Sequence, residues 1–121
     1  MPSRQTVEAF VALVEAGDYV GAIEKFYAPD ASTRENNDEP VAGRNTLMAK
    51  ERGVMAAFRN IEASRIGPSL IDGDTAATRW KFTFSGIDGT IRVLEETSWQ
   101  TWRDDLLIEE RFFYDPKQMK G

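Results

Sequence analysis

The hydrophobic pattern of the chain changes period near Ile61, and this change restricts the fold more than any other feature. Before it, apolar residues recur at helical spacing, with helices expected to begin at Ser3, Asp18 and Asn45. After it, β-type residues alternate between turn sequences such as Asp88-Gly89. Three helices followed by an antiparallel meander predict an α+β fold with the helices laid across a curved sheet. Residues 30–36 are expected to form one further short strand between the second and third helices.

The segment from Glu95 to Pro116 is predicted to be a hairpin with Asp104-Asp105 as its two loop residues. In that register Trp102 faces Leu107 and Trp99 faces Glu110. Alternation then places one set of side chains on a single face of the sheet. The set is Glu95, Thr97, Trp99, Thr101, Ile108, Glu110, Phe112 and Tyr114. An aromatic face that holds two carboxylates is a poor structural core and suits a ligand site.

The preceding strand extends the same face if Asp88-Gly89 is a two-residue turn. Trp80 and Phe82 then lie opposite Thr97 and Glu95 and join the aromatic wall. The opposite face mixes charged and apolar side chains, a composition that fits either a wet surface or a dimer interface.

Composition excludes several functional classes. The 121 residues are expected to form one domain, 1–121, and they contain neither cysteine nor histidine. This removes thiolate and imidazole chemistry and the common zinc sites. No Asp-rich calcium-loop spacing occurs, so no metal and no cofactor is expected. A net charge of −5 argues against nucleic acid. No apolar run is long enough to span a membrane, and no hydrophobic leader is visible, so cytoplasmic residence is expected.

The order of three segments resembles the SnoaL-like branch of the nuclear transport factor 2-like superfamily, which also contains ketosteroid isomerases and polyketide cyclases. The segments are AGDYVGAIEKFYAPDAS from Ala16 to Ser32, the ENN…PVAG that follows, and the terminal WRDDxxIEERFFYDP. The resemblance implies a cone-shaped fold, a strongly curved sheet wrapped by three helices with a pocket in the open end. It also implies a homodimer formed through the convex sheet face.

The catalytic groups of ketosteroid isomerases do not carry over to this chain. The resemblance places Phe10 at the position of their tyrosine donor and Asn36 at or near the position of their aspartate base. Their second acid corresponds to Thr97 or Ser98. Steroid isomerisation is therefore not expected. The polyketide cyclases often use a histidine, which this chain lacks.

Glu110 and Glu95 are the carboxylates expected to move a proton, since an aromatic wall would raise the pKa of such a group. Pairing of Glu110 with an arginine is the competing interpretation. Around the expected base position, either Asn36 or the pair Glu35 and Asn37 points inward. Asn36, together with Thr97, is expected to orient the substrate. The remaining expected contacts to substrate are Phe10, Trp80, Phe82, Thr97, Trp99, Phe112 and Tyr114.

Two functional classes fit this sequence. One is a cofactor-independent acid–base enzyme, an isomerase, cyclase, dehydratase or hydrolase, acting on an apolar carbonyl-bearing or ring compound. The other is a non-catalytic module that binds a ligand or a partner. A raised pKa of Glu110 beside an open pocket favours the first class, and a glutamate locked to an arginine favours the second.

Overall fold

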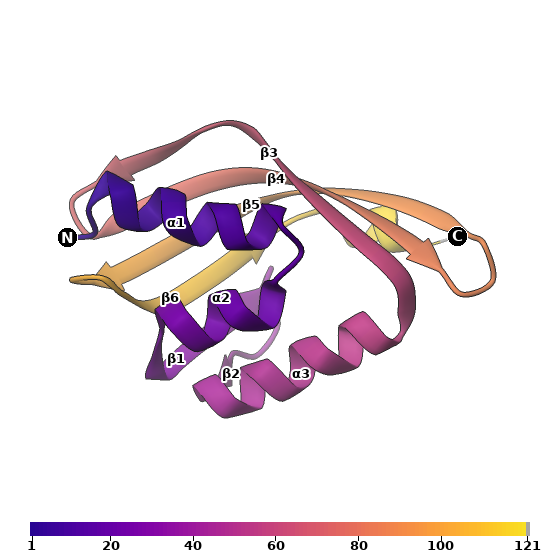
Figure 1. The fold of residues 1–121 in the computed structure, drawn as a ribbon, viewed down its shortest axis with the longest axis horizontal. Helices are drawn as coiled ribbons and strands as arrows, with labels where there is room; N and C mark the ends of the chain where they lie inside the picture. The colour runs from indigo at the N-terminus through magenta and orange to yellow at the C-terminus, as the bar shows by residue number, and fades with distance from the viewer. Residues whose placement is uncertain (121) are drawn as a thin grey trace.

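The computed structural model describes residues 1–120. Its elements, in order along the chain (Figure 1), are α1 (Arg4–Glu15), α2 (Tyr19–Phe26), β1 (Tyr27–Glu35), β2 (Val41–Ala42), α3 (Arg44–Ala56), β3 (Phe58–Asp72), β4 (Thr75–Gly86), β5 (Ile91–Arg103), β6 (Leu106–Phe113) and the short 3-10 helix η1 (Pro116–Met119). The predicted α+β class, with three helices preceding the long strands, is confirmed.

Local capping explains where the first two helices begin. The Ser3 hydroxyl accepts a hydrogen bond from the Thr6 backbone N–H at 3.0 Å, and the Asp18 carboxylate accepts one from Gly21 N–H, also at 3.0 Å. Between these helices Gly17 has a φ of 81°, a conformation that glycine adopts without strain. The third helix has no side-chain cap and begins after Gly43.

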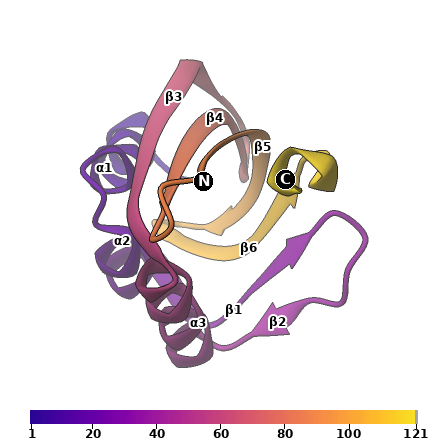
Figure 2. The same ribbon diagram turned by 90° about the vertical axis from the view of Figure 1, so that its right-hand side faces the viewer.

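Within the described residues the sheet has the strand order β2-β1-β6-β5-β4-β3. Its neighbours are antiparallel except that β1 and β6 run parallel, so the sheet is mixed rather than purely antiparallel as expected. The last strand returns to lie beside the first one after the meander, and the long connection between them permits the parallel direction. Figure 2 shows the sheet bending into an arc that does not close, with the three helices along its open side.

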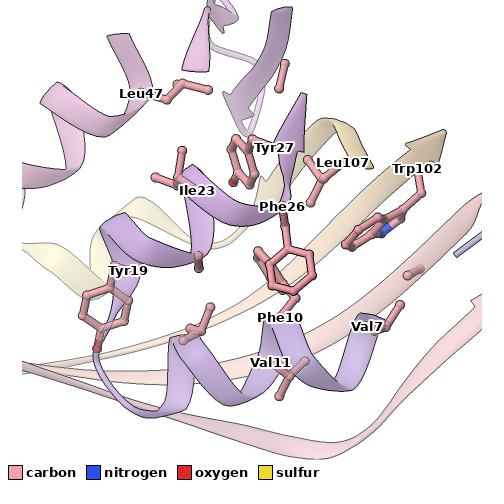
Figure 3. Packing of buried hydrophobic residues seen from close by; sticks show 14 of the residues in the cluster. Val7, Phe10, Val11, Tyr19, Ile23, Phe26, Tyr27, Leu47, Trp102 and Leu107 are labelled. Atoms are coloured by element: carbon pink, nitrogen blue, oxygen red, sulfur yellow. The ribbon is translucent and has the colours of Figure 1, made fainter. Parts of the chain in front are cut away.

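The hydrophobic core lies between the sheet and the helices (Figure 3). Phe10 of α1 packs edge-on against Phe26 and Trp102, with ring centroids 5.8 and 6.1 Å away (Figure 3). Trp102 is 1% exposed and Leu107 is fully buried. These side chains do not fill the whole space between the sheet and the helices, and a cavity remains beside them.

The register of the β5–β6 hairpin differs from the prediction. The turn at Asp104-Asp105 and the pairing of Trp102 with Leu107 are confirmed, but the register shifts between Thr101 and Trp102. Ile108 is the extra residue of a bulge in β6, so Gln100, not Trp99, lies opposite Glu110. This one-residue shift reverses the predicted face on β5 while leaving it correct on the end of β6.

The β4–β5 register also differs by one residue. The turn is longer than two residues, since the last strand pair is Ser85 with Ile91 and Gly86 N–H bonds Thr90 C=O at 2.7 Å. Trp80 therefore lies opposite Glu96 rather than Thr97. Both shifts have the same consequence: the even-numbered residues of β5 face the helices.

Candidate functional site

A cavity of about 250 Å³ lies between the concave face of the sheet and the helices. Its walls are mainly aromatic and aliphatic side chains from all three helices and five strands. The aromatic lining residues are Phe10, Tyr19, Tyr27, Trp80, Phe82, Phe84 and Phe112. Buried Phe10, Tyr27 and Trp80 lie towards the core, whereas half-buried Phe82 and Phe112 lie towards solvent. This is a small pocket by the standard of ligand sites, so it suits a compact ligand.

Glu110 of β6 lies in this cavity and is only 3% exposed. Its carboxyl group receives three hydrogen bonds, from the Tyr27 hydroxyl, from Ser98 Oγ at 2.5 Å and from Gln100 Nε2 at 2.8 Å. Gln100 is fixed in turn, because its Oε1 accepts from the Trp102 indole N–H at 3.0 Å. Every polar atom of this network therefore has a partner among the residues that build the core.

Burial raises the pKa of Glu110, and the hydrogen bonds from Ser98, Tyr27 and Gln100 oppose that rise. Burial together with the neighbouring Glu110 carboxyl raises the pKa of Tyr27 well above its ordinary value. The competing interpretation of an arginine pair does not hold, since neutral donors occupy both carboxyl oxygens. Glu110 is thus a carboxyl group held by a neutral hydrogen-bond network.

Glu96 of β5 is the second carboxyl group in the cavity, opposite Trp80 on the neighbouring strand. Burial and the negative charges of Glu110, Glu35 and Glu51 raise its pKa to about 8. No hydrogen bond or ion pair within residues 1–120 engages its side chain. An unpartnered carboxyl that changes protonation near neutral pH, in a cavity, is the group best placed to act on a ligand.

The outer part of the cavity carries a third and a fourth glutamate. Burial raises the pKa of Glu51 on α3. Glu35 at the end of β1 accepts a hydrogen bond from the Tyr114 hydroxyl at 2.9 Å and lies 3.6 Å from Lys50 Nζ. Lys50 and Glu35 have side chains about two-fifths exposed, which places this pair at the mouth.

Six of the predicted site residues line the cavity: Phe10, Glu35, Trp80, Phe82, Glu110 and Phe112. Of the two alternatives at the end of β1, Glu35 faces inward and Asn36 does not. Asn36 has a φ of 51° and accepts the Tyr114 N–H through its Oδ1 at 2.9 Å, so it ends the strand and holds the C-terminal segment. Tyr114 lies beyond the cavity wall and reaches it only through its bond to Glu35.

The predictions for Glu95, Thr97 and Trp99 need correction, because all three project from the convex face. Glu95 is exposed, and its backbone N–H and C=O bond the Gln118 side chain at 2.9 and 3.0 Å. Trp99 is 52% exposed. The physical cause is the pair of register shifts described above, which turn the odd-numbered residues of β5 outward.

Sequence reasoning missed Glu96, Glu51 and the role of Tyr27. A signal was present in β5, where alternate residues Leu94, Ser98 and Trp102 are apolar or small and flank Glu96. The other set of alternate residues, which includes Trp99, is similarly apolar, and only the bulge determines which of the two sets faces inward. Within residues 1–120, no group of three His, Cys, Asp or Glu side chains is arranged to hold a metal ion. Over the same residues, no helix has the length and apolar character needed to cross a membrane.

The model of the SnoaL-like domain family matches residues 7–110, and the chain belongs to this family. No curated protein matches the sequence. Among solved structures, a protein from Mesorhizobium loti assigned to the SnoaL-like polyketide cyclases is 26% identical, with a TM-score of 0.76 and coverage of 91% of this chain and 97% of that one.

Two further solved structures share the fold at lower identity. An NTF2-like protein of unknown function from Burkholderia pseudomallei is 13% identical, with a TM-score of 0.82, covering 97% of this chain and 95% of that one. TerC co-crystallised with polyporic acid is 14% identical, with a TM-score of 0.80, covering 95% and 92%. The family model confirms the expected SnoaL-like family, and the solved structures confirm its curved-sheet fold.

Proposed function

We propose that this SnoaL-like chain, as one domain, binds a small apolar molecule in the cavity and exchanges a proton with it through Glu96. The observation that carries the proposal is the unpartnered Glu96 carboxyl, with its pKa raised to about 8 inside an aromatic-walled cavity. The co-crystal of TerC with polyporic acid supports the small-molecule part, since that protein has the same fold.

The chemistry open to Glu96 is general acid–base catalysis without a cofactor. Near neutral pH the protonated carboxyl donates to a ligand oxygen or nitrogen, and the ionised form removes a proton. Glu110 acts through Glu96 as a positioning residue, because its charge contributes to the raised pKa of that group. Isomerisation, cyclisation, dehydration and hydrolysis all fit such a site.

A non-catalytic binding role is the second candidate. It is favoured by the Glu110 network, in which Tyr27, Ser98 and Gln100 are all committed to Glu110 and not directed at a ligand. In that case the cavity holds a ligand and Glu96 only sets its charge.

The convex face is proposed as a homodimer interface of a cytoplasmic protein. Trp99, Val93 and Phe113 are large apolar side chains between 42 and 52% exposed, and the Arg111 guanidinium lies 4.6 Å from the Phe113 ring centroid. An apolar patch of this kind on a sheet suits a second copy. Sedimentation of wild type and Trp99→Ser tests it. A monomeric wild type would contradict the dimer, and a dimer unaffected by the substitution would contradict this interface.

The test of the pocket function is a carboxyl ¹³C NMR titration of glutamate-labelled protein, alone and with 1-naphthylmethanol as a compact neutral probe. We expect the Glu96 carboxyl to titrate near pH 8, and the Glu96 and Glu110 signals to move on addition of the probe. Glu95→Gln is the matched control, since it removes a neighbouring carboxyl on the outer face. A Glu96 that titrates near 4.5 and signals that the probe leaves unmoved would refute the proposal.

A further inference from the structure

The charges around the cavity are unbalanced. Glu35, Glu51, Glu96 and Glu110 reach it from β1, α3, β5 and β6, and Lys50 is the one cationic side chain among the described lining residues. Lys50 lies at the mouth, where its Nζ is 3.6 Å from a Glu35 oxygen. The positive charge of Lys50 also acts on Glu51, whereas the Glu96 carboxyl group is left without a cationic partner.

The groups that face Glu96 come from several elements and share one sign. Glu110, Glu35 and Glu51 each act on it with negative charge. The walls supplied by α1, α2, β3 and β4 are uncharged, with Tyr19 as their titratable group, and β1 adds Tyr27. The three donors nearby are all bonded to Glu110. No group of the described residues therefore offsets the negative charge that Glu96 carries when it is ionised.

The carboxyl groups favour a positively charged ligand, and the aromatic walls favour one too. Trp80 and Phe82 stand side by side on β4, with ring centroids 5.8 Å apart, and Phe84 continues the row 6.2 Å from Phe82. The face of an aromatic ring is electronegative and attracts a cation placed over it. A ligand that combines apolar rings with a positive group can therefore meet both the rings and the carboxyls.

We propose that the ligand of this cavity is a compact apolar amine bound in its protonated form, with the ammonium at Glu96 and the apolar body against Trp80 and Phe82. This inference rests on the binding part of the proposed function and names its ligand class. The protonation balance is simple: the ammonium enters with its own proton, and Glu96 releases its carboxyl proton to solvent. No bond other than this O–H bond breaks.

Ligands of other charge fit less well. An anion adds a further negative charge to the four carboxyls, and a neutral ligand leaves the repulsion between them unchanged. A cation relieves that repulsion and offsets the electrostatic cost of ionising Glu96. Burial of the ion pair between Glu96 and the ligand is tolerable because the cavity opens to solvent past half-buried side chains.

The experiment compares three probes with one skeleton: 1-naphthylmethylamine, 1-naphthylmethanol and 1-naphthoate. Isothermal titration calorimetry at pH 7, in two buffers of different ionisation enthalpy, gives the affinity and the protons released. We expect the amine to bind about tenfold or more tighter than the alcohol, and the carboxylate to bind most weakly. We also expect the amine to release roughly one proton at pH 7 and much less at pH 9.

Three variants test which carboxyl group causes the preference for the amine. Glu96→Gln should remove most of the advantage of the amine and its proton release, whereas Glu95→Gln should leave both unchanged. Glu51→Gln, which removes a carboxyl group whose negative charge acts on Glu96, should reduce the advantage in part. If the alcohol binds as tightly as the amine, the amine inference fails and the proposed pocket function stands. If none of the three probes binds, the proposed function itself fails.

Discussion

The two carboxyl groups in the cavity differ in their hydrogen bonds: the one at the closed end has donors, and the one towards the open end has none. At the closed end, Glu110 has three donors and is 3% exposed. Towards the open end, Glu96 is half-buried and has no partner within residues 1–120. A satisfied buried carboxyl stabilises the fold that surrounds it, whereas an unsatisfied one costs stability and persists where a ligand can use it.

The same contrast divides the two faces of β5. Its inward residue Glu96 lines the cavity, and its inward residues Ser98 and Gln100 hold Glu110. Its outward residues Glu95, Thr97 and Trp99 form the convex surface. Two adjacent glutamates thus have unrelated roles. Substitutions at Glu110, Glu96, Asn36 and Glu95 test this contrast from the largest effect to the smallest.

Glu110→Ala is expected to have the largest effect on stability. It removes the acceptor of three donors, two of them hydroxyls buried in the core, and leaves a void beside Tyr27. We expect a loss of about 3–5 kcal/mol in the free energy of unfolding. Urea denaturation followed by far-UV circular dichroism measures it. Glu110→Gln, which keeps the shape and one acceptor, should lose clearly less, and equal losses would contradict the hydrogen-bond account.

Glu96→Gln is expected to stabilise the protein above about pH 4.5, and increasingly so up to about pH 8. The pKa of Glu96 is raised from 4.5 to about 8, so the folded state holds a proton that the unfolded state has released between these values. Wild-type stability should therefore fall as pH rises through this window, with no penalty from Glu96 below pH 4.5. The glutamine variant lacks this decline and should exceed wild type by about 3 kcal/mol at pH 7 and by about 4–5 kcal/mol at pH 9.

The measurement is the difference between the two unfolding free energies at pH 4.5, 7 and 9. A difference that stays constant over this range would mean that Glu96 is not desolvated. A difference of the opposite sign would mean that an unrecognised donor holds the ionised form of Glu96.

The fold could be predicted from the sequence to the level of its elements, and the site only in part. Hydrophobic spacing and the capping residues Ser3 and Asp18 act over a few residues, so they were visible in the sequence. The side of a strand that faces inward depends on register, and a single bulged residue, Ile108, changes it. Glu110 lies between the bulge and the strand end on the face that the pattern favoured, and Glu95 does not.

Hydrogen bonds between residues far apart in the chain could not be predicted from the sequence either. The prediction that Asn36 would point to substrate followed from its position in related enzymes. Its φ of 51° and its bond to the Tyr114 N–H arise because β6 ends beside it, 78 residues further along the chain. Contacts of this kind depend on the parallel pairing of β1 with β6, which no local pattern indicates.

Asn36→Ala is expected to have a moderate effect on stability. It removes the acceptor of the Tyr114 N–H and puts a less tolerant residue at positive φ. We expect a loss of about 1–2 kcal/mol. Asn36→Gly separates the two causes, because it relieves the backbone and still lacks the acceptor. If Asn36 contacted a ligand instead, Asn36→Ala would weaken probe binding without changing the urea midpoint.

Glu95→Gln is expected to have the smallest effect, although it lies next to the residue with the raised pKa. Its side chain is exposed on the convex face, and the bonds that Gln118 makes to it involve only its backbone. We expect a change of less than about 0.5 kcal/mol in the free energy of unfolding at every pH, with binding of 1-naphthylmethanol unchanged. A pH-dependent difference like that of Glu96→Gln would place Glu95 inside the cavity and restore the register without the bulge. The even- and odd-numbered residues of β5 would then exchange their faces.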